Sequence, residues 1–238
     1  MISLSYDLHL HSCLSPCGDD DMTPANIVGM AVLKELDVIA LTDHNSCKNC
    51  PALLKAAKEQ GILAIPGMEL TTLEEVHVVC LFAELVDAMS FDKLVEEKLV
   101  RVKNNPDIFG KQQIMNHTEQ VIGVVDSLLI NSTRISFDEV YELLKEYHGI
   151  MIPAHIDKNA NSLISNLGFV PPDSKFSCFE VKNMANLHVL QAANTYLKDC
   201  KVITNSDAHY LWDINEAVNT IYTKERSVSA ILRALLHN

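Results

Sequence analysis

The sequence predicts an α/β fold in which short parallel strands alternate with helices and close into a barrel. Seven short apolar segments of strand-like composition are separated mainly by segments with helical start and stop signals. The length of 238 residues suits one such domain, since barrels of this class commonly contain roughly 200–250 residues. We therefore expect a single domain over residues 1–238.

The first part of the chain carries clear helix boundaries. Thr23 can cap a helix whose first position suits Pro24. Pro51 begins a second helix, and Gly61 fits its C-terminal end. In order, the expected elements are a strand at 3–9, a helix at about 24–34, a strand at 38–41, a helix at about 51–61 and strands at 63–65 and 76–82.

Residues 84–148 interrupt this alternation, and we interpret them as a helical insertion. Ser136 and Glu139 form a capping box, and the helix that follows places apolar side chains on one face until Gly149 ends it. No linker rich in Ser, Gly or Pro separates the region as its own domain. Its other expected elements are a helix from Ser90 to about 103, a turn at 104–107 and a helix at about 119–129.

The alternation resumes after the insertion and continues to the end of the chain. The expected elements are strands at 150–153, 178–181 and 202–205, a helix near 187–198, a further strand at 219–222 and a closing helix at 227–236.

Composition places limits on location and partners. No apolar run approaches the roughly 18 residues that span a bilayer, and the N-terminus lacks a basic leader, so we expect a cytoplasmic protein without membrane contact. The net charge of −12 disfavours extended nucleic-acid binding, which requires many neutralised phosphates. A small phosphorylated ligand stays compatible with this charge, because bound metal ions would reverse the local sign.

Seven cysteines without an export signal indicate reduced thiols. Cys13, Cys17, Cys47 and Cys50 form two closely spaced pairs. These pairs could form a thiolate metal site or a redox pair, but a lone C-x-x-C is a weak signal and we favour unlinked thiols.

Imidazole and carboxylate side chains recur where the predicted strands end. His9 and His11 point to one face of the first strand, while Leu8 and Leu10 point to the other. Paired imidazoles are costly to bury unless they are bound, and with carboxylates they suit a divalent transition metal. His77 precedes its strand and does not follow this rule. The other members of the pattern are Thr42-Asp43-His44, Glu69, His155 and Asp207-Ala208-His209. Active sites of barrels form at this end of the strands, so we expect one metal site there.

The motifs, taken together and in this order, resemble those of the PHP superfamily, the polymerase and histidinol phosphatase group of metal-dependent phosphoesterases. The resemblance implies a distorted, TIM-like (β/α)7 barrel with two to three divalent ions, Zn, Mn or Fe. In place of the family's usual Ser-Asp-Gly, this chain reads Ser15-Pro16-Cys17-Gly18-Asp19-Asp20. Asp19 is the favoured acidic ligand and Asp20 the alternative. The implied metal ligands are His9, His11, Asp19, His44, Glu69, His77, His155, Asp207 and His209.

The expected chemistry is attack of a metal-bound hydroxide on a phosphoric ester. Glu69 is expected to bridge two cations, and catalytic roles are assigned to Glu69, Asp207 and His209. Arg134 and Lys158 are expected to bind the substrate phosphate, since they are close in sequence to the predicted site loops.

Residues around the ligands receive supporting roles. Asp7 and Asp43 are expected to accept imidazole N–H groups, and Glu180 and Asn183 are expected to face the site. The histidines without a partner motif are taken as structural or exposed; they are His117, His148, His188 and His237.

The main functional expectation is hydrolysis of a small phosphorylated metabolite or nucleotide. The first alternative is an exonuclease or nucleotide phosphatase that acts on nucleic-acid ends. The second is a non-catalytic, metal-stabilised regulatory module. The sequence does not predict the oligomeric state.

Overall fold

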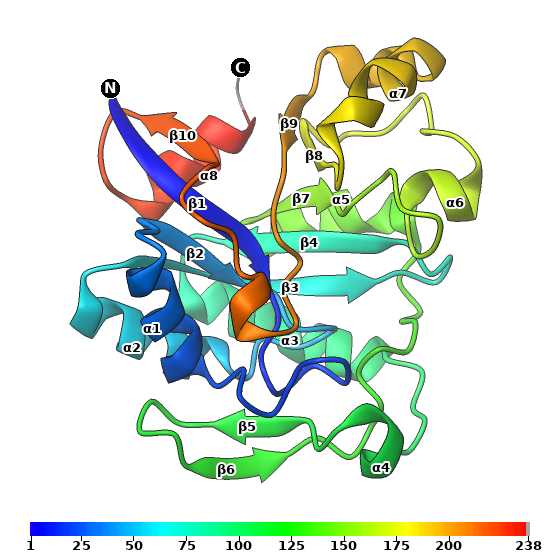
Figure 1. The fold of residues 1–238 in the computed structure, drawn as a ribbon. Coiled ribbons are helices and arrows are strands. Elements are labelled where there is room, and N and C mark those ends of the chain that lie inside the picture. Colours follow the sequence, from blue (N-terminus) through cyan, green and yellow to red (C-terminus); the bar gives the residue numbers. More distant parts are fainter. Residues whose placement is uncertain (237–238) are drawn as a thin grey trace.

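A six-stranded mixed sheet forms the centre of the molecule in the computed structural model, which describes residues 1–236 (Figure 1). The strand order is β10-β1-β2-β3-β4-β7, with β1, β2 and β3 parallel, β4 antiparallel to both β3 and β7, and β10 antiparallel to β1. The strands are β1 (Ile2–Leu10), β2 (Val38–Leu41), β3 (Leu63–Thr71), β4 (His77–Phe82), β7 (Gly149–Pro153) and β10 (Thr220–Thr223).

The sheet curls, and the chain beyond β7 leads back toward β1. A separate parallel pair, β8 (Cys178–Glu180) and β9 (Lys201–Ile203), follows β7, and Ile156 N donates to Glu180 O at 2.9 Å. After β9, Ala208 O accepts the N–H of His11 at 3.0 Å. The fold is thus a mixed α/β half-barrel. A complete (β/α)7 barrel is not confirmed, because β3 and β4 join without a helix and the described strands form three separate sheets.

Two apolar layers cover the two faces of the sheet. Ile39 and Leu41 of β2 pack with one layer, and Val38 and Ala40 pack with the other, as strand alternation requires. The first layer is covered by α1 (Pro24–Leu33), α2 (Cys50–Gln60), α3 (Leu85–Lys98) and α5 (Phe137–Glu146), and the second by α8 (Val228–Leu236). Within residues 1–236, no helix combines the length and the apolar character needed to cross a membrane.

The predicted helix boundaries in the first part of the chain are confirmed. Thr23 accepts the N–H of Asn26 at 3.2 Å and Pro24 is the first residue of α1. Gly61 follows α2 with a φ of 73°, a left-handed conformation that costs glycine little. The capping box of Ser136 and Glu139 begins α5.

The prediction of a helical insertion over 84–148 is wrong in part. Residues 119–129 do not form a helix; β6 (Val121–Val124) pairs there with β5 (Gln113–Met115) as an antiparallel hairpin. The β-branched Val121, Ile122 and Val124 favour the extended backbone. The short helix α4 (Pro106–Phe109) overlaps the end of the turn that was predicted at 104–107.

Two boundaries in this region also differ from prediction. Helix α3 starts at Leu85, and Ser90, predicted as its cap, donates to Val86 O at 2.8 Å from within the helix. Gly149 does not end α5 but begins β7, where a Cβ would lie 2.6 Å from the Phe82 ring. His148 follows the helix and takes the left-handed turn, with a φ of 55°.

The C-terminal third contains short helices that the sequence did not resolve. Helix α6 (Leu163–Leu167) was not predicted, and the expected helix at 187–198 divides into α7 (Leu187–Ala193) and a 3-10 turn, Thr195–Lys198. Two further 3-10 turns occupy Met184–Asn186 and Leu211–Asp213.

Candidate metal centre

One edge of the curled sheet gathers the predicted ligands. The parallel strands β1, β2 and β3 end at this edge and deliver His9, His44 and Glu69. Because β4 runs antiparallel to β3, its first residue, His77, is paired with Thr71 and lies at the same edge. The strand direction explains why His77 precedes its strand and still belongs to the cluster.

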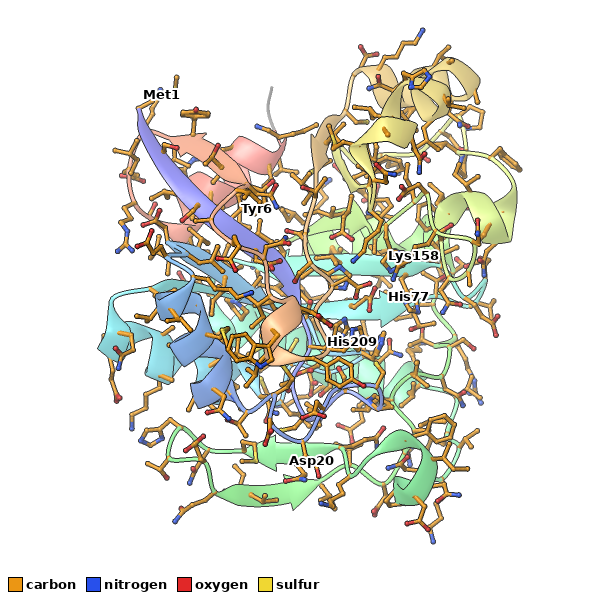
Figure 2. The ribbon with its side chains drawn as sticks, viewed as in Figure 1. Met1, Tyr6, Asp20, His77, Lys158 and His209 are labelled. Atoms are coloured by element: carbon orange, nitrogen blue, oxygen red, sulfur yellow. The ribbon has the colours of Figure 1, made fainter. Side chains whose placement is uncertain are left out.

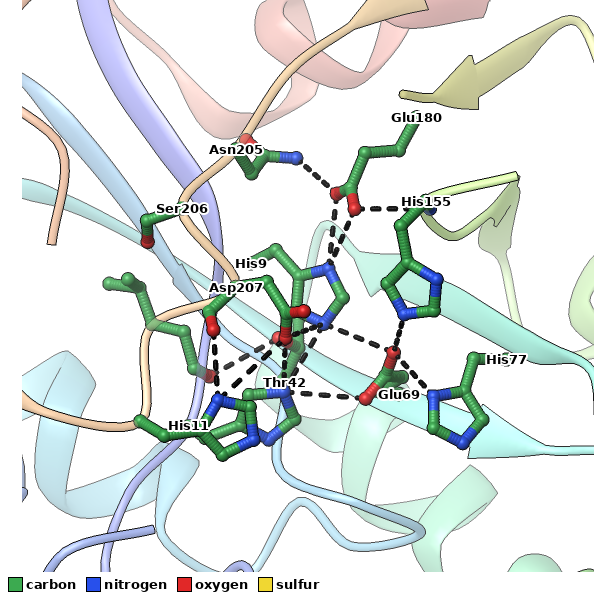
Figure 3. A network of polar contacts seen from close by, with 12 residues as sticks. His9, His11, Thr42, Glu69, His77, His155, Glu180, Asn205, Ser206 and Asp207 are labelled. Atoms are coloured by element: carbon green, nitrogen blue, oxygen red, sulfur yellow. Dashed lines mark hydrogen bonds and ion pairs between the residues drawn. The ribbon is translucent and has the colours of Figure 1, made fainter. Parts of the chain in front are cut away.

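Glu69 lies at the centre of the cluster and is only 1% exposed (Figure 3). Five imidazoles surround its two carboxylate oxygens. The distances to Oε1 are 2.9 Å from His77 Nδ1, 3.1 Å from His155 Nε2 and 3.2 Å from His9 Nε2, and those to Oε2 are 3.0 Å from His44 Nδ1 and 3.3 Å from His11 Nε2.

Asp207 supplies a second buried carboxylate on the other side of the first histidines. Its Oδ1 lies 3.5 Å from His9 Nε2 and 3.4 Å from His11 Nε2. Lys158 Nζ donates to its Oδ2, so the predicted phosphate-binding lysine lies at the cluster. The ring of His209 stacks on that of His11 with centroids 4.3 Å apart.

Hydrogen bonds at the Nδ1 atoms orient the rings of His9 and His11. His9 Nδ1 lies 3.0 Å from Glu180 Oε2. The Glu180 carboxylate also accepts the backbone N–H of His155 at 3.1 Å. His11 Nδ1 lies 3.0 Å from the hydroxyl of Ser15. Each Nδ1 is therefore engaged, and each Nε2 is directed toward the carboxylates.

The predicted contacts of Asp7 and Asp43 with imidazoles are wrong. Asp43 accepts the N–H and the hydroxyl of Ser12, at 2.6 Å and 2.7 Å, and reaches His11 only through Ser15, whose hydroxyl it accepts at 2.8 Å. Asp7 accepts two backbone N–H groups of a loop that follows β9. Both carboxylates thus accept backbone N–H groups, and among the described residues neither has a direct hydrogen bond or ion pair with an imidazole.

The first strand does not keep the strict alternation that the sequence predicts. A register shift between β1 and β2 lies between Asp7 and Leu10. Leu8 packs in the layer under α8 and Leu10 in the opposite layer, so they do not share a face. His9 and His11 nevertheless converge, with their Nε2 atoms 3.2 Å apart.

Burial and mutual charge set the ionisation of the cluster. Burial would raise the pKa of Glu69, but the surrounding imidazoles hold that pKa well below its usual range. Burial lowers the pKa of His44 to about 3 and that of His209 to about 4. Burial also opposes charge on His9, but Glu180 and the nearby carboxylates raise its pKa. Anionic Glu69 with neutral His44 and His209 is the protonation state that binds metals.

The donor set fits divalent transition metals. His44 Nδ1 and Glu69 Oε2 lie 3.0 Å apart, yet both are buried without a hydrogen-bond partner among the described residues, as expected of atoms directed at a common ion. Imidazole with carboxylate is the ligand chemistry of Zn, Mn and Fe. Three overlapping groups could each hold an ion: His11, His44 and His209; His9, His11, Glu69 and Asp207; and His44, Glu69 and His77.

Backbone strain accompanies the ligands. Asn45, His155 and Asp207 have φ values of 49°, 28° and 57°, in the left-handed region that non-glycine residues seldom occupy. Asn45 is held there by side-chain hydrogen bonds to Leu129 O at 2.7 Å and from Thr71 N at 2.9 Å. Such strain persists where the surroundings impose it, often at functional sites.

Some predicted site residues are not brought into the cluster. The N–H of Asp19 donates to His209 O at 3.0 Å, but its carboxylate accepts the N–H of Asp21. Asp20 pairs with Lys111 at 3.0 Å beside the β5–β6 hairpin, away from His209 (Figure 2). Arg134 is exposed, and its backbone N–H donates to the C-terminal end of α3.

The remaining polar candidates lie outside the cluster. Asn183 caps a 3-10 turn by accepting the N–H of Ala185 at 2.9 Å, so it does not face the ligands. His148 and His188 are exposed, His117 is half-buried, and His237 lies outside the described residues. The seven cysteines are free, and the ligand groups found within residues 1–236 contain none of them.

Ser15 and Asn205 are site residues that the sequence analysis did not identify. Asn205 donates to Glu180 at 2.6 Å and accepts the N–H of Leu8 at 2.8 Å, which joins β1 to the segment after β9. Its position directly before Ser206-Asp207 is the signal that could have indicated it. No pattern marks Ser15, because its role depends on how the loop folds over Asp43.

A buried cluster of imidazoles and carboxylates at one sheet edge defines a metal-binding hydrolase centre. The chain belongs to the PHP domain family: residues 7–157 match the PHP domain, and residues 183–238 match the PHP-associated family. The cluster draws on both matched regions, since Glu69 lies in the first and Asp207 in the second.

Relatives in sequence include two nucleases. The chain is 33% identical over 109 residues to a 5'-3' exoribonuclease of Haemophilus influenzae and 31% identical over 97 residues to the 5'-3' exoribonuclease Rnm of Salmonella typhimurium. These segments cover 44% and 39% of this chain. They span only 39% and 32% of the two relatives.

Solved structures share the fold. Endonuclease Q of Pyrococcus furiosus, a lesion-specific endonuclease, superposes with a TM-score of 0.70 at 18% identity, over 99% of this chain and 56% of its own. A candidate metal-dependent phosphoesterase of Bifidobacterium adolescentis superposes with a TM-score of 0.61 at 15% identity, over 97% and 95% of the two chains. The relatives in sequence are exoribonucleases, which hydrolyse phosphoric esters, in agreement with the expected enzyme class.

These comparisons correct the expected partner. A small phosphorylated substrate without extended nucleic-acid contact was predicted, but the sequence relatives are exoribonucleases, and endonuclease Q has been solved with a 27-mer duplex. The net charge misled the prediction. Part of the −12 belongs to cluster carboxylates such as Glu69 and Asp207, whose charge bound cations would offset.

Proposed function

We propose that this chain hydrolyses phosphodiester bonds at the ends of nucleic-acid strands with the help of two or three divalent cations. The proposal rests on the buried cluster in which five imidazoles and Asp207 gather around Glu69. The PHP family match supports hydrolysis of a phosphoric ester, and the exoribonuclease relatives support a nucleic-acid end as the substrate.

The proposed cation ligands are the nine residues that the motifs indicated. Eight of them meet at the cluster: His9, His11, His44, Glu69, His77, His155, Asp207 and His209. Asp19 is the ninth, and its backbone N–H donates to His209 O, which places its turn beside the cluster. Glu69 presents a different oxygen to each side of the cluster, which suits a bridge between two cations.

When bound, divalent cations would supply Lewis acidity toward phosphate oxygens and lower the pKa of water to near neutrality. The chain itself holds the ligands in place: Glu180 fixes the ring of His9, and Ser15 fixes that of His11. Lys158 is 37% exposed in its side chain and adds a positive charge at the rim beside Asp207, where a phosphate would approach. We assign catalytic roles to Glu69, Asp207 and His209.

We further propose that residues 1–238 act as one domain. Glu180, between the two matched regions, contacts His9 of the first, and Asp207 of the second contacts Lys158. An isolated first region would lack Asp207 and His209, and its cluster would be incomplete.

Product analysis on labelled single-stranded RNA and DNA tests the proposal. The full chain, loaded in turn with Mn, Zn or Fe, should release mononucleotides from one end, and a chelator should abolish this release. A circular single strand has no ends and should not be hydrolysed. Cleavage of the circle would overturn the assignment to strand ends. Absence of hydrolysis with every metal, despite tight metal binding, would favour the regulatory module.

Lysine variants refine the test. Lys158→Met should raise KM for the labelled strand, because it removes the rim charge while leaving the ligands in place. Lys175→Met serves as the matched control, since that lysine pairs with Glu142 on the surface and is 53% exposed. Equal kinetics of the two variants would remove Lys158 from substrate binding.

A further inference from the structure

Two large aromatic side chains, one and three residues after the cluster residue His209, are exposed. Tyr210 is 55% exposed and Trp212 is 77% exposed. Trp212 is the single tryptophan of the chain. Aromatic side chains of this size are ordinarily well buried, and exposed ones are enriched where a partner binds. Their place beside the cluster indicates that the partner is the substrate.

The backbone that presents these rings is fixed. Lys34, at the end of α1, is 9% exposed, and its Nζ donates to Trp212 O at 3.0 Å and to Ile214 O. The fully buried Asp7 accepts one backbone N–H at each end of residues 206–215. Because two buried charges hold this segment, the exposure of Trp212 is a property of the fold and not of a loose loop.

Tyr210 and Trp212 belong to the segment that continues from His209, a residue at the open side of the cluster. The side chain of His209 is 23% exposed and that of Lys158 is 37% exposed, whereas those of Glu69, His9 and His11 are at most 1% exposed. The opening therefore lies at His209 and Lys158, both of which are labelled in Figure 2. The 3-10 turn Leu211–Asp213, which carries Trp212, starts two residues beyond His209.

We propose that the exposed rings of Tyr210 and Trp212 stack on unpaired bases of a single-stranded nucleic acid whose end enters the cluster. The inference rests on the proposed function and narrows its substrate to a single strand. Bases in a duplex already stack on each other, whereas unpaired bases offer free ring faces. Base stacking on exposed aromatic side chains would add affinity beyond the contact of Lys158 with phosphate.

The single tryptophan gives a direct binding signal. The chelator-treated full chain is titrated with a short single-stranded oligonucleotide while tryptophan fluorescence is recorded. We expect saturable quenching of Trp212. A strand of equal length made of abasic sites, with the same phosphates, should quench weakly. Equal quenching by the abasic strand would overturn the proposal, because it would show that phosphates alone account for binding.

Variants at the same position separate stacking from structure. Anisotropy of a labelled strand should show binding about fivefold to a hundredfold weaker for Trp212→Leu, the loss expected for one stacked base. Trp212→Phe keeps a ring face and should bind within a few-fold of the original chain. Tyr222→Ala is the matched control, because Tyr222 is 61% exposed but pairs with Ser3 at the far end of β1. Identical affinities for the leucine and phenylalanine variants would overturn the proposal.

Kinetics distinguish failure of the base-stacking proposal from failure of the proposed function. With metal bound, Trp212→Leu should raise KM for a single strand and leave kcat nearly unchanged. Base-dependent quenching without hydrolysis would sustain the stacking surface and reject the nuclease. Hydrolysis with an unaltered KM in Trp212→Leu would sustain the nuclease and reject the stacking surface. Concentration-dependent dimerisation that Trp212→Leu abolishes, without base-dependent quenching, would reassign the rings to an interface between copies.

Discussion

Asp7 and Asn215, which are far apart in sequence, are joined by a partly buried hydrogen bond of 3.0 Å from the Asn215 N–H to the Asp7 carboxylate. The other oxygen of Asp7 accepts the N–H of Ser206 at 3.1 Å. The segment between these two residues carries the proposed ligands Asp207 and His209. One carboxylate in β1 therefore ties both ends of this segment, in addition to the contacts that Lys34 and His11 make with it.

Asp7→Asn should destabilise the protein and weaken metal binding together. The asparagine keeps one acceptor but directs an NH2 group at the other backbone donor, which is left buried and unpaired. The expected cost is about 1–3 kcal/mol of unfolding free energy. Denaturant unfolding measures this cost, and elemental analysis measures retained metal.

Asp37→Asn is the matched control for that change. Asp37 also accepts a strand N–H, that of Ser5 at 2.9 Å, but its side chain is 41% exposed and it touches no ligand loop. We expect little change in metal content. If Asp37→Asn lost as much metal as Asp7→Asn, the loop would not be the cause.

Glu69→Gln should remove the central anion while keeping the side-chain shape. Five imidazoles would then face an amide, and we expect metal content to fall and turnover to drop by more than about a hundredfold, beyond the loss typical of residues that only support ligands. Elemental analysis and initial rates measure both effects. Glu96→Gln, at an exposed ion pair with Lys48, is the control. A Glu69→Gln enzyme with intact rate and metal would place the centre elsewhere.

Glu180→Gln should act through His9. The amide cannot accept as strongly from the ring at 3.0 Å, and the loss of this orienting contact should cost about 10- to 100-fold in metal affinity. Metal titration followed by competition with a chromophoric chelator measures the affinity. His155 and Asn205 also donate to Glu180 and hold its carboxylate in place. An unchanged affinity would show that the Glu180 charge is not needed to orient the His9 ring.

Metal removal should lower thermal stability. Ligands that bind only the folded state stabilise it, by about 2.7 kcal/mol at a free concentration a hundred times Kd. The unpaired His44 and Glu69 atoms should gain most from a bound ion. We expect a chelator to lower Tm in the original chain and to leave Tm of Glu69→Gln nearly unaffected. A chelator effect of equal size in both proteins would point to a separate metal site.

The sequence predicts where the helices begin and end better than it predicts how the strands are arranged in the sheet. Thr23 and Gly61 specify their boundaries through local chemistry, one by a capping hydroxyl and one by a left-handed backbone. Strand direction is not local: β3 and β4 are antiparallel because a short turn at 72–76 connects them, and the apolar pattern of each strand is the same in either direction. The β5–β6 hairpin was missed because its polar turn and short strands lack a clear period.

Most residues of the cluster, and Glu180 behind His9, were predictable from the sequence, whereas other supporting contacts were not. His9, Glu69 and Asp207 belong to motifs that name their chemistry. Further supporting contacts come from Ser15 and Asn205, whose partners Asp43 and Leu8 are remote in sequence. Asp7 was assigned to an imidazole because strand alternation placed it near His9, but the register shift in β1 and the loop from β9 gave its carboxylate backbone donors instead.

Gly149→Ala should destabilise the sheet without touching the cluster chemistry. A Cβ at this position would lie 2.6 Å from the Phe82 ring and 3.0 Å from Leu144, both in the core. Overpacking of this kind costs about 1–3 kcal/mol. Gly29→Ala is the matched control: Gly29 lies in α1 with nothing within 4 Å of the added methyl group, so alanine should stabilise the helix by about 0.5–1 kcal/mol. Denaturant unfolding of both variants compares the two effects, and equal stabilities would show that Phe82 and Leu144 yield without strain.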